Sequence, residues 1–83
     1  MQLAVLGAGA WGTALAIAMA RRHRVRLWCR DPAQAQQITH ERCNRRYLPE
    51  VPLPEDVAVT ADFPEALAGA DLALIVTPLA GLG

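Results

Sequence analysis

Residues 3–20 read LAVLGAGAWGTALAIAMA, in which a short apolar run leads through three closely spaced glycines into a stretch of small residues. The apolar run at residues 2–6 predicts a strand buried on both faces, and residues 10–22 predict a helix that is apolar nearly all round and therefore buried. Gly7, Gly9 and Gly12 form the pattern G-x-G-x-x-G between these elements. In this strand–turn–helix setting the pattern is a dinucleotide-binding fingerprint, whereas by itself it could mark an unliganded alanine-rich turn.

Each glycine of the fingerprint has its own physical task. Gly7 permits the tight turn from strand to helix, Gly9 lets the backbone approach a pyrophosphate, and Gly12 lets the helix pack closely on the strand. The anion would bind unpaired N–H groups at the start of the helix, where the helix dipole favours negative charge. Gly7, Gly9, Ala10 and Gly12 are therefore predicted cofactor-binding residues.

The rest of the chain alternates between predicted strands and helices. Strands are expected at residues 24–29, 57–60 and 72–77, and helices are expected to follow N-caps at Asp31 and Asp62. Three closely spaced prolines predict that residues 44–54 lack regular structure. Right-handed crossovers between parallel strands then give an α/β fold of the Rossmann type, with strand order 3-2-1-4. The ligand would lie at the carboxyl ends of the first and fourth strands, between the glycine turn, Arg30 and the turn at residues 77–78.

The residue after the second strand indicates which nucleotide is bound. Enzymes that use the unphosphorylated cofactor usually place an acid here, which accepts hydrogen bonds from the ribose hydroxyls. This chain has Arg30, whose donors suit a 2′-phosphate, followed by Asp31. NADP(H) is therefore favoured over NAD(H). Arg30 could instead be an ordinary solvated side chain, and Asp31 could either cap the next helix or reach the ribose.

Composition excludes several functions. The 83 residues carry eight basic and eight acidic side chains, so there is no net attraction to nucleic acid or to a membrane surface. The apolar stretch at residues 14–20 is too short to span a bilayer, and the N-terminus shows no secretory signal. Cys29 is expected to pack as a small hydrophobe in a reducing cytoplasm, and His40 with Cys43 lacks the second ligand pair that a metal site needs.

Four segments together resemble bacterial glycerol-3-phosphate dehydrogenase. They are the glycine turn, the Leu27–Pro32 segment, the N-R-R-Y-L-P-E-V-P-L-P loop at residues 44–54, and the strand leading to Thr77–Pro78. The resemblance covers essentially the whole chain but only the opening quarter of such an enzyme, and Leu79 stands where the family often has serine. It implies an enzyme that interconverts sn-glycerol 3-phosphate and dihydroxyacetone phosphate with NAD(P)H for glycerophospholipid synthesis.

The resemblance also implies three cofactor neighbours, Trp11, Arg30 and Tyr47. Trp11 could wall the pyrophosphate or merely cover the strand ends, and Tyr47 could pack near adenine or anchor its loop. The family performs its carbonyl chemistry with lysines, and this chain contains none. We therefore expect no catalytic residue within residues 1–83, which would form the N-terminal part of the NAD(P)-binding domain without the helical substrate domain.

The expected truncation has a consequence for assembly. The parent enzyme is expected to be a homo-oligomer that acts on a small molecule. The strand Leu72–Thr77 would expose an unpaired apolar edge here, so the fragment is expected to pair through it, unless residues 78–83 fold over the exposed face.

Two other function classes fit the same residues. A related 3-hydroxyacid or 6-phosphogluconate dehydrogenase shares the glycine turn and often the arginine, although the loop around Tyr47 disfavours it. A non-catalytic nucleotide-sensing module gains support from the missing lysines. A flavoprotein is disfavoured because flavoproteins usually keep an acid after the second strand.

Overall fold

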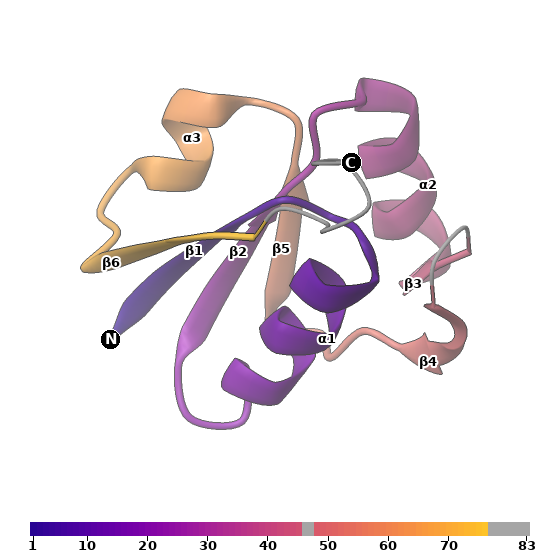
Figure 1. Ribbon diagram of the computed structural model, residues 1–83, viewed down its shortest axis with the longest axis horizontal. Helices are drawn as coiled ribbons and strands as arrows, with labels where there is room; N and C mark the ends of the chain where they lie inside the picture. Colours follow the sequence, from indigo (N-terminus) through magenta and orange to yellow (C-terminus); the bar gives the residue numbers. More distant parts are fainter. Residues whose placement is uncertain (46–47, 77–83) are drawn as a thin grey trace, which may run out of the picture.

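The computed structural model describes residues 1–45 and 48–76, which form a parallel sheet with helices on both faces (Figure 1). Nine elements follow one another along the chain: β1 (Gln2–Leu6), α1 (Ala10–Met19), β2 (Arg24–Trp28), α2 (Pro32–Glu41), β3 (Cys43–Asn44), β4 (Leu48–Pro52), β5 (Val57–Thr60), α3 (Phe63–Leu67) and β6 (Leu72–Ile75). No helix within the described part of the chain has the length and apolar character needed to cross a membrane.

The main sheet has the order β5-β2-β1-β6, and all three pairings are parallel. The register sets Leu3 beside Val25 on one side and Leu72 on the other. Since β5 and β6 are the third and fourth predicted strands, the predicted order 3-2-1-4 is confirmed. Three elements are shorter than expected: α1 ends at Met19, β2 ends at Trp28 and β6 ends at Ile75.

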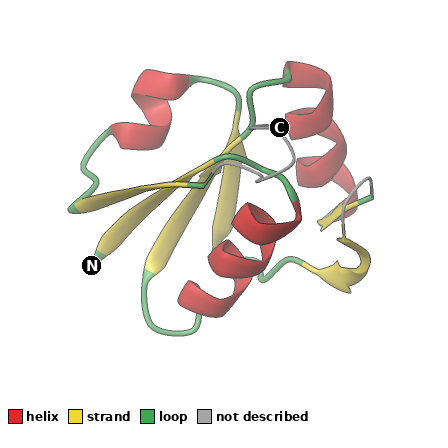
Figure 2. Cartoon of the chain, viewed as in Figure 1, coloured by secondary structure: helices red, strands yellow, loops and turns green. Residues whose placement is uncertain are grey.

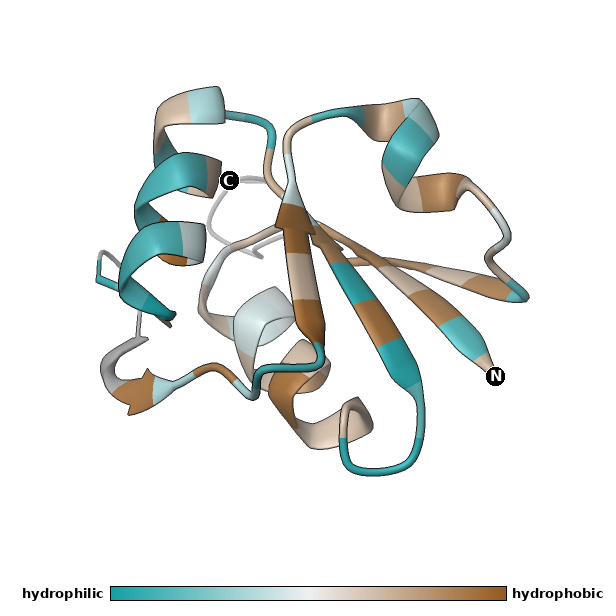
Figure 3. Ribbon diagram, turned by 180° about the vertical axis from the view of Figure 1, so that it is seen from behind, coloured by the Kyte–Doolittle hydropathy of each residue, from teal (hydrophilic) through white to brown (hydrophobic). Residues whose placement is uncertain are grey.

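Two apolar cores lie on opposite faces of the sheet, with α1 and α2 covering one face and α3 the other (Figure 2). Leu3 and Val5 of β1 join the first core, while Ala4 and Leu6 join the second. This confirms that β1 is buried on both faces. The next strand, β2, alternates hydrophilic and hydrophobic residues along its length (Figure 3).

Helix α1 is less buried than its composition predicts. Only Gly12, Thr13 and Ala16 are buried, whereas Ala14 and Ala18 are exposed. The expectation of burial all round was therefore wrong for this chain. A helix lying on one sheet contacts it along a single stripe, and uniformly apolar composition does not reveal how many neighbours cover the remaining sides.

The predicted helix starts are confirmed in atomic detail. The Asp31 carboxylate accepts a hydrogen bond from the Ala33 N–H at 2.9 Å, and the Asp62 carboxylate accepts one from the Glu65 N–H at 3.2 Å. The Asp62 N–H donates to the Thr60 hydroxyl at 3.0 Å, rather than to Glu65 as in the usual capping box.

The proline-rich segment contains a strand where irregular structure was expected. Strand β4 pairs antiparallel with β3, placing Cys43 opposite Pro52 and Asn44 opposite Leu48, with an irregularity between the two pairs. Each strand of a two-stranded ribbon is an edge strand, where proline's missing N–H costs little. Proline also holds the preceding residue extended, as a strand requires. The prediction for residues 48–52 was therefore wrong.

Candidate functional site

A cleft of about 600 Å³ opens at the carboxyl end of β1, between the neighbouring strands β2 and β6. Glycine-turn residues form one wall, and residues at the ends of β2, α2 and β6 complete it. The lining residues are Gly7, Ala8, Gly9, Ala10, Trp11, Gly12, Trp28, Arg30, Gln34 and Val76. The structure thus gathers five predicted cofactor-binding residues of the glycine turn and Arg30 around one cleft.

Gly7 and Gly12 are required by the fold itself. Gly7 has a φ of +128°, and a Cβ there would lie 2.3 Å from the Val76 carbonyl oxygen. A Cβ on Gly12 would lie 1.7 Å from the Gly7 carbonyl oxygen. Because contacts this short do not occur between real atoms, Gly7 makes the turn possible and Gly12 allows α1 to approach the turn closely.

Gly9 is different, because nothing in the described chain requires a glycine there. Its φ of −77° and ψ of −171° suit any residue, and a Cβ there would meet no atom within 4 Å. Gly9 is also the N-cap of α1, where no side chain accepts from the first-turn N–H groups. Among the described residues, the first-turn N–H donors therefore have no partner at this end of the cleft, and nothing lies in front of Gly9.

The charge of the cleft favours an anion. Arg30 is the charged side chain among the lining residues, and it is exposed. The carboxylate of Asp31, the next residue, is the N-cap of α2 and accepts a hydrogen bond from that helix.

Cys29 lies next to Arg30 in the sequence but is a packed hydrophobe and no nucleophile. Burial, and secondarily the charge of Asp31, raises the pKa of its thiol to about 11.

Of the two aromatic residues predicted as cofactor neighbours, the structure describes only Trp11. Trp11 lines the cleft and is 76% exposed, so its indole is accessible to a ligand. Tyr47 lies outside the described residues, as does the Thr77–Pro78 turn.

Three residues at or behind the cleft were not predicted. Trp28 closes one side, held by its indole N–H donating to the Ala61 carbonyl at 3.1 Å and by edge-to-face packing on Phe63. Gln34 lines the cleft and donates to the Ala8 carbonyl at 3.2 Å. The buried Asn44 donates to the same carbonyl at 2.7 Å. Asn44 stands within the loop that carries the resemblance, but no spacing in the sequence connects it to the glycine turn.

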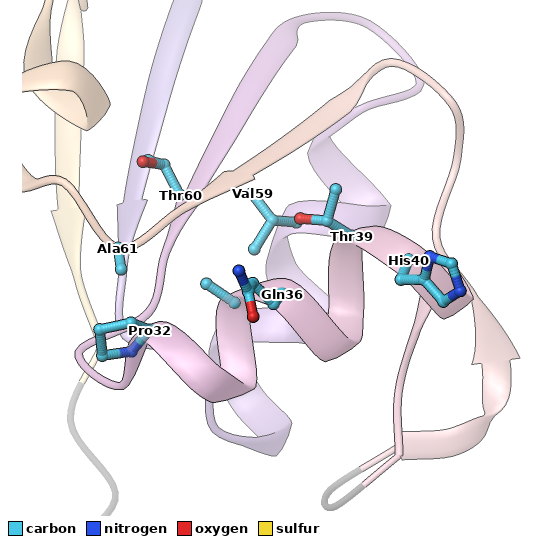
Figure 4. Close-up of a pocket in the computed structure, with 8 residues that line it drawn as sticks. Pro32, Gln36, Thr39, His40, Val59, Thr60 and Ala61 are labelled. Atoms are coloured by element: carbon cyan, nitrogen blue, oxygen red, sulfur yellow. The ribbon is translucent and has the colours of Figure 1, made fainter.

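A second hollow, of about 740 Å³, lies between α2 and β5 (Figure 4). Gln36 and Thr39 of α2 stand beside Val59 of β5 there, and His40 is at one end. Among the described side chains that line it, no charged or polar groups converge on one point. We therefore place the candidate site at the glycine turn.

The whole chain is similar to one family of known proteins. Residues 2–83 match the family model described as NAD-dependent glycerol-3-phosphate dehydrogenase N-terminus. A glycerol-3-phosphate dehydrogenase (NAD(P)+) of Aromatoleum aromaticum is 58% identical over 82 residues, covering 99% of this chain and 25% of that protein. A protein of the same name from Deinococcus radiodurans is 57% identical over 81 residues, covering 96% of this chain and 25% of its own length. The chain thus spans about a quarter of the length of these curated relatives.

Solved structures give the same result. The crystal structure of glycerol-3-phosphate dehydrogenase from Coxiella burnetii superimposes with a TM-score of 0.87 at 42% identity, over 93% of this chain and 24% of that one. The Saccharomyces cerevisiae enzyme superimposes with a TM-score of 0.83 at 22% identity, over 99% of this chain and 27% of that one, which supports the fold alone.

Proposed function

The chain belongs to the family of NAD-dependent glycerol-3-phosphate dehydrogenase N-terminal domains, and from this premise we propose that it binds the nicotinamide cofactor of such an enzyme. The cofactor pyrophosphate would lie on the glycine turn, at the N-terminus of α1. Gly7, Gly9, Ala10, Trp11 and Gly12 would form this part of the site, with Tyr47 as a further neighbour.

The observation that carries the proposal is the open space at Gly9. Within the described part of the chain, Gly7 and Gly12 have steric reasons to be glycine, and Gly9 has none. A side chain at Gly9 would project into a cleft that is lined by helix N–H donors and an arginine. Close approach of an anionic ligand to the backbone is a physical reason for glycine at this position.

Arg30 supports a preference for the phosphorylated cofactor. It follows the second strand, where an acid would otherwise accept from both ribose hydroxyls, and Asp31 is engaged in capping α2. The guanidinium offers several donors to a 2′-phosphate and no acceptor to a ribose. We therefore favour NADP(H), with NAD(H) as the alternative.

The catalytic groups would lie outside these residues. A bound nicotinamide cofactor supplies the hydride in this chemistry, while the protein must supply a proton donor and a charge-stabilising group for the substrate oxygen. The chain contains no lysine, and its cleft offers one arginine. We propose that residues 1–83 hold the cofactor within a larger, cytoplasmic, homo-oligomeric enzyme whose other domain binds dihydroxyacetone phosphate or sn-glycerol 3-phosphate, for glycerophospholipid synthesis.

The test uses the full-length protein that carries this chain. Calorimetric titration should give micromolar or tighter binding of NADPH or NADH, and either cofactor should be oxidised when dihydroxyacetone phosphate is added. Oxidation with a 3-hydroxyacid's ketone instead would favour a related dehydrogenase. Binding without turnover of any ketone would favour a nucleotide sensor, and absence of binding would refute the proposal.

A further inference from the structure

Two side-chain amides converge on one carbonyl of the glycine turn. The Ala8 carbonyl oxygen accepts from Asn44 Nδ2 at 2.7 Å and from Gln34 Nε2 at 3.2 Å. Asn44 is completely buried at the start of the β3–β4 ribbon, and Gln34 lies in the first turn of α2. Two elements distant in sequence thus fix the direction of a single peptide group.

The direction of that carbonyl determines the direction of a neighbouring donor. Ala8 and Gly9 share a peptide bond, and in a trans peptide the C=O and N–H groups point in opposite directions within one plane. When the Ala8 carbonyl points at the buried amide of Asn44, the Gly9 N–H must point away from it. Gly9 lines the cleft and Asn44 does not, so a Gly9 N–H that points away from Asn44 is available to a ligand in the cleft.

Asn44 also bonds to helix α1, through the side chain of Thr13. Its Nδ2 donates a second hydrogen bond, of 2.8 Å, to the Thr13 hydroxyl. The Thr13 N–H in turn donates to the Gly9 carbonyl at 3.0 Å. One buried amide group therefore bonds both to the carbonyl of the peptide before Gly9 and to the side chain of Thr13, whose N–H bonds to the Gly9 carbonyl.

We propose that Asn44 is a positioning residue for the cofactor pyrophosphate, holding the Gly9 peptide so that its N–H is aimed into the cleft before the ligand arrives. Gln34 assists from the cleft side. The inference rests on the proposed function, because it assumes that an anion binds at the glycine turn. Such preorganisation lowers the cost of binding, since the backbone need not be ordered by the ligand itself.

Attaching the β3–β4 ribbon to the rest of the domain does not by itself explain why a buried asparagine stands at position 44. Gln37 Nε2 donates to the Cys43 carbonyl at 2.9 Å, and the Leu53 N–H donates to the Arg42 carbonyl at 2.7 Å, so the end of the ribbon where Cys43 pairs with Pro52 is already tied to α2 and its C-cap. Burying an amide is also costly here, because Asn44 Oδ1 has no partner among the described residues. An apolar side chain would avoid this cost but could not orient the Ala8 carbonyl.

The test compares three variants of the full-length dehydrogenase. Asn44→Leu keeps a similar volume and removes both donors, Gln34→Ala removes the second donor on the Ala8 carbonyl, and Gln37→Ala is the control that loosens the ribbon without touching the glycine turn. Each variant is checked for folding by circular dichroism and urea denaturation. Cofactor affinity is measured by titration with NADH and NADPH, and ADP and adenosine are tested as competitors.

We expect Asn44→Leu to raise the cofactor Kd by about tenfold, the size of one well-placed hydrogen bond to a charged group, and Gln34→Ala to raise it by about threefold. Gln37→Ala should change the Kd by less than about twofold even if it lowers stability as much. The competitor ADP should lose affinity in parallel, while adenosine, which lacks phosphates, should not. In Asn44→Leu the kcat at saturating cofactor should be unchanged and the KM for the cofactor should be raised, because the lost interaction stabilises the ground state and the transition state equally.

The outcomes separate the two proposals. If the wild-type protein binds no cofactor, the proposed function fails and this inference with it. If the wild-type binds and Asn44→Leu and Gln34→Ala bind equally well, only the positioning role is overturned. An equal loss in Gln37→Ala, or an equal loss of adenosine affinity, would show that general loosening is the cause. If Asn44→Leu does not fold, the comparison of Gln34→Ala with Gln37→Ala still shows whether the hydrogen bonds to the Ala8 carbonyl affect cofactor affinity.

Discussion

Gly9→Ser should raise the stability of the protein and lower its affinity for the cofactor. Gly9 is the N-cap of α1 with φ −77° and ψ −171°, an extended conformation that serine adopts without strain, and a Cβ there meets no atom within 4 Å. Serine could accept from the first-turn N–H groups that no side chain caps at present. Better capping contributes a few tenths of a kcal/mol, and the lost freedom of glycine in the unfolded chain adds about 0.4–1 kcal/mol. The free energy of unfolding should therefore rise by about 0.6–1.4 kcal/mol.

The same substitution should remove most of the cofactor affinity. The serine hydroxyl would occupy the space in front of the turn and accept hydrogen bonds from the N–H groups that the pyrophosphate needs. Losing two hydrogen bonds to a charged group costs about 3–5 kcal/mol, which corresponds to a Kd raised by more than about a hundredfold. Stability and affinity would thus change in opposite directions at a single residue.

The assay pairs urea denaturation with calorimetric titration of NADH and NADPH in the full-length protein. Gly12→Ala is the matched comparison, because its Cβ would lie 1.7 Å from the Gly7 carbonyl oxygen. It should destabilise the fold by about 1–3 kcal/mol or more through overpacking. Unchanged cofactor affinity in a folded Gly9→Ser protein would refute the placement of the pyrophosphate. A loss of stability in Gly9→Ser would refute the conclusion that the fold does not need a glycine there.

Three further predictions concern other parts of the chain. Arg30→Asp should weaken NADPH binding by about 1.5–3 kcal/mol and leave NADH binding unchanged or improved, and an equal loss for both in titrations would contradict pairing with the 2′-phosphate. Cys29, whose folded pKa is raised to about 11 from 9.0, should resist iodoacetamide at pH 8, and fast alkylation of Cys29 itself, rather than of Cys43, in the folded protein would contradict this. Because the unfolded thiol ionises first, stability should fall as the pH rises from about 9 to 11. The isolated 83-residue chain should associate at micromolar concentration through the strand predicted at Leu72–Thr77, since Leu72 and Ile75 are 47% and 77% exposed and β6 is the last strand of the described sheet; light scattering from a clean monomer with a cooperative melt would contradict it.

The sequence by itself determined the features that depend on local chemistry and on fold-wide rules. The apolar run before Gly7 predicted β1, and the carboxylates of Asp31 and Asp62 predicted where α2 and α3 begin, because a cap bonds to N–H groups two or three residues away. The strand order followed from right-handed crossovers between parallel strands, a rule that does not depend on individual contacts. The glycine turn and Arg30 could be placed at one cleft because the carboxyl ends of parallel strands share one edge of the sheet.

Only the tertiary structure decided which of these glycines the fold requires and which one it does not. The three glycines look equivalent in the sequence, but the Val76 and Gly7 carbonyl oxygens stand against Gly7 and Gly12, while open space stands in front of Gly9. The role of Asn44 is likewise set by a carbonyl 36 positions away in the chain. The exposure of α1 depends on how many neighbours surround the helix, which its composition does not record. All three arise from contacts between segments that the chain brings together only on folding, and no local pattern encodes them.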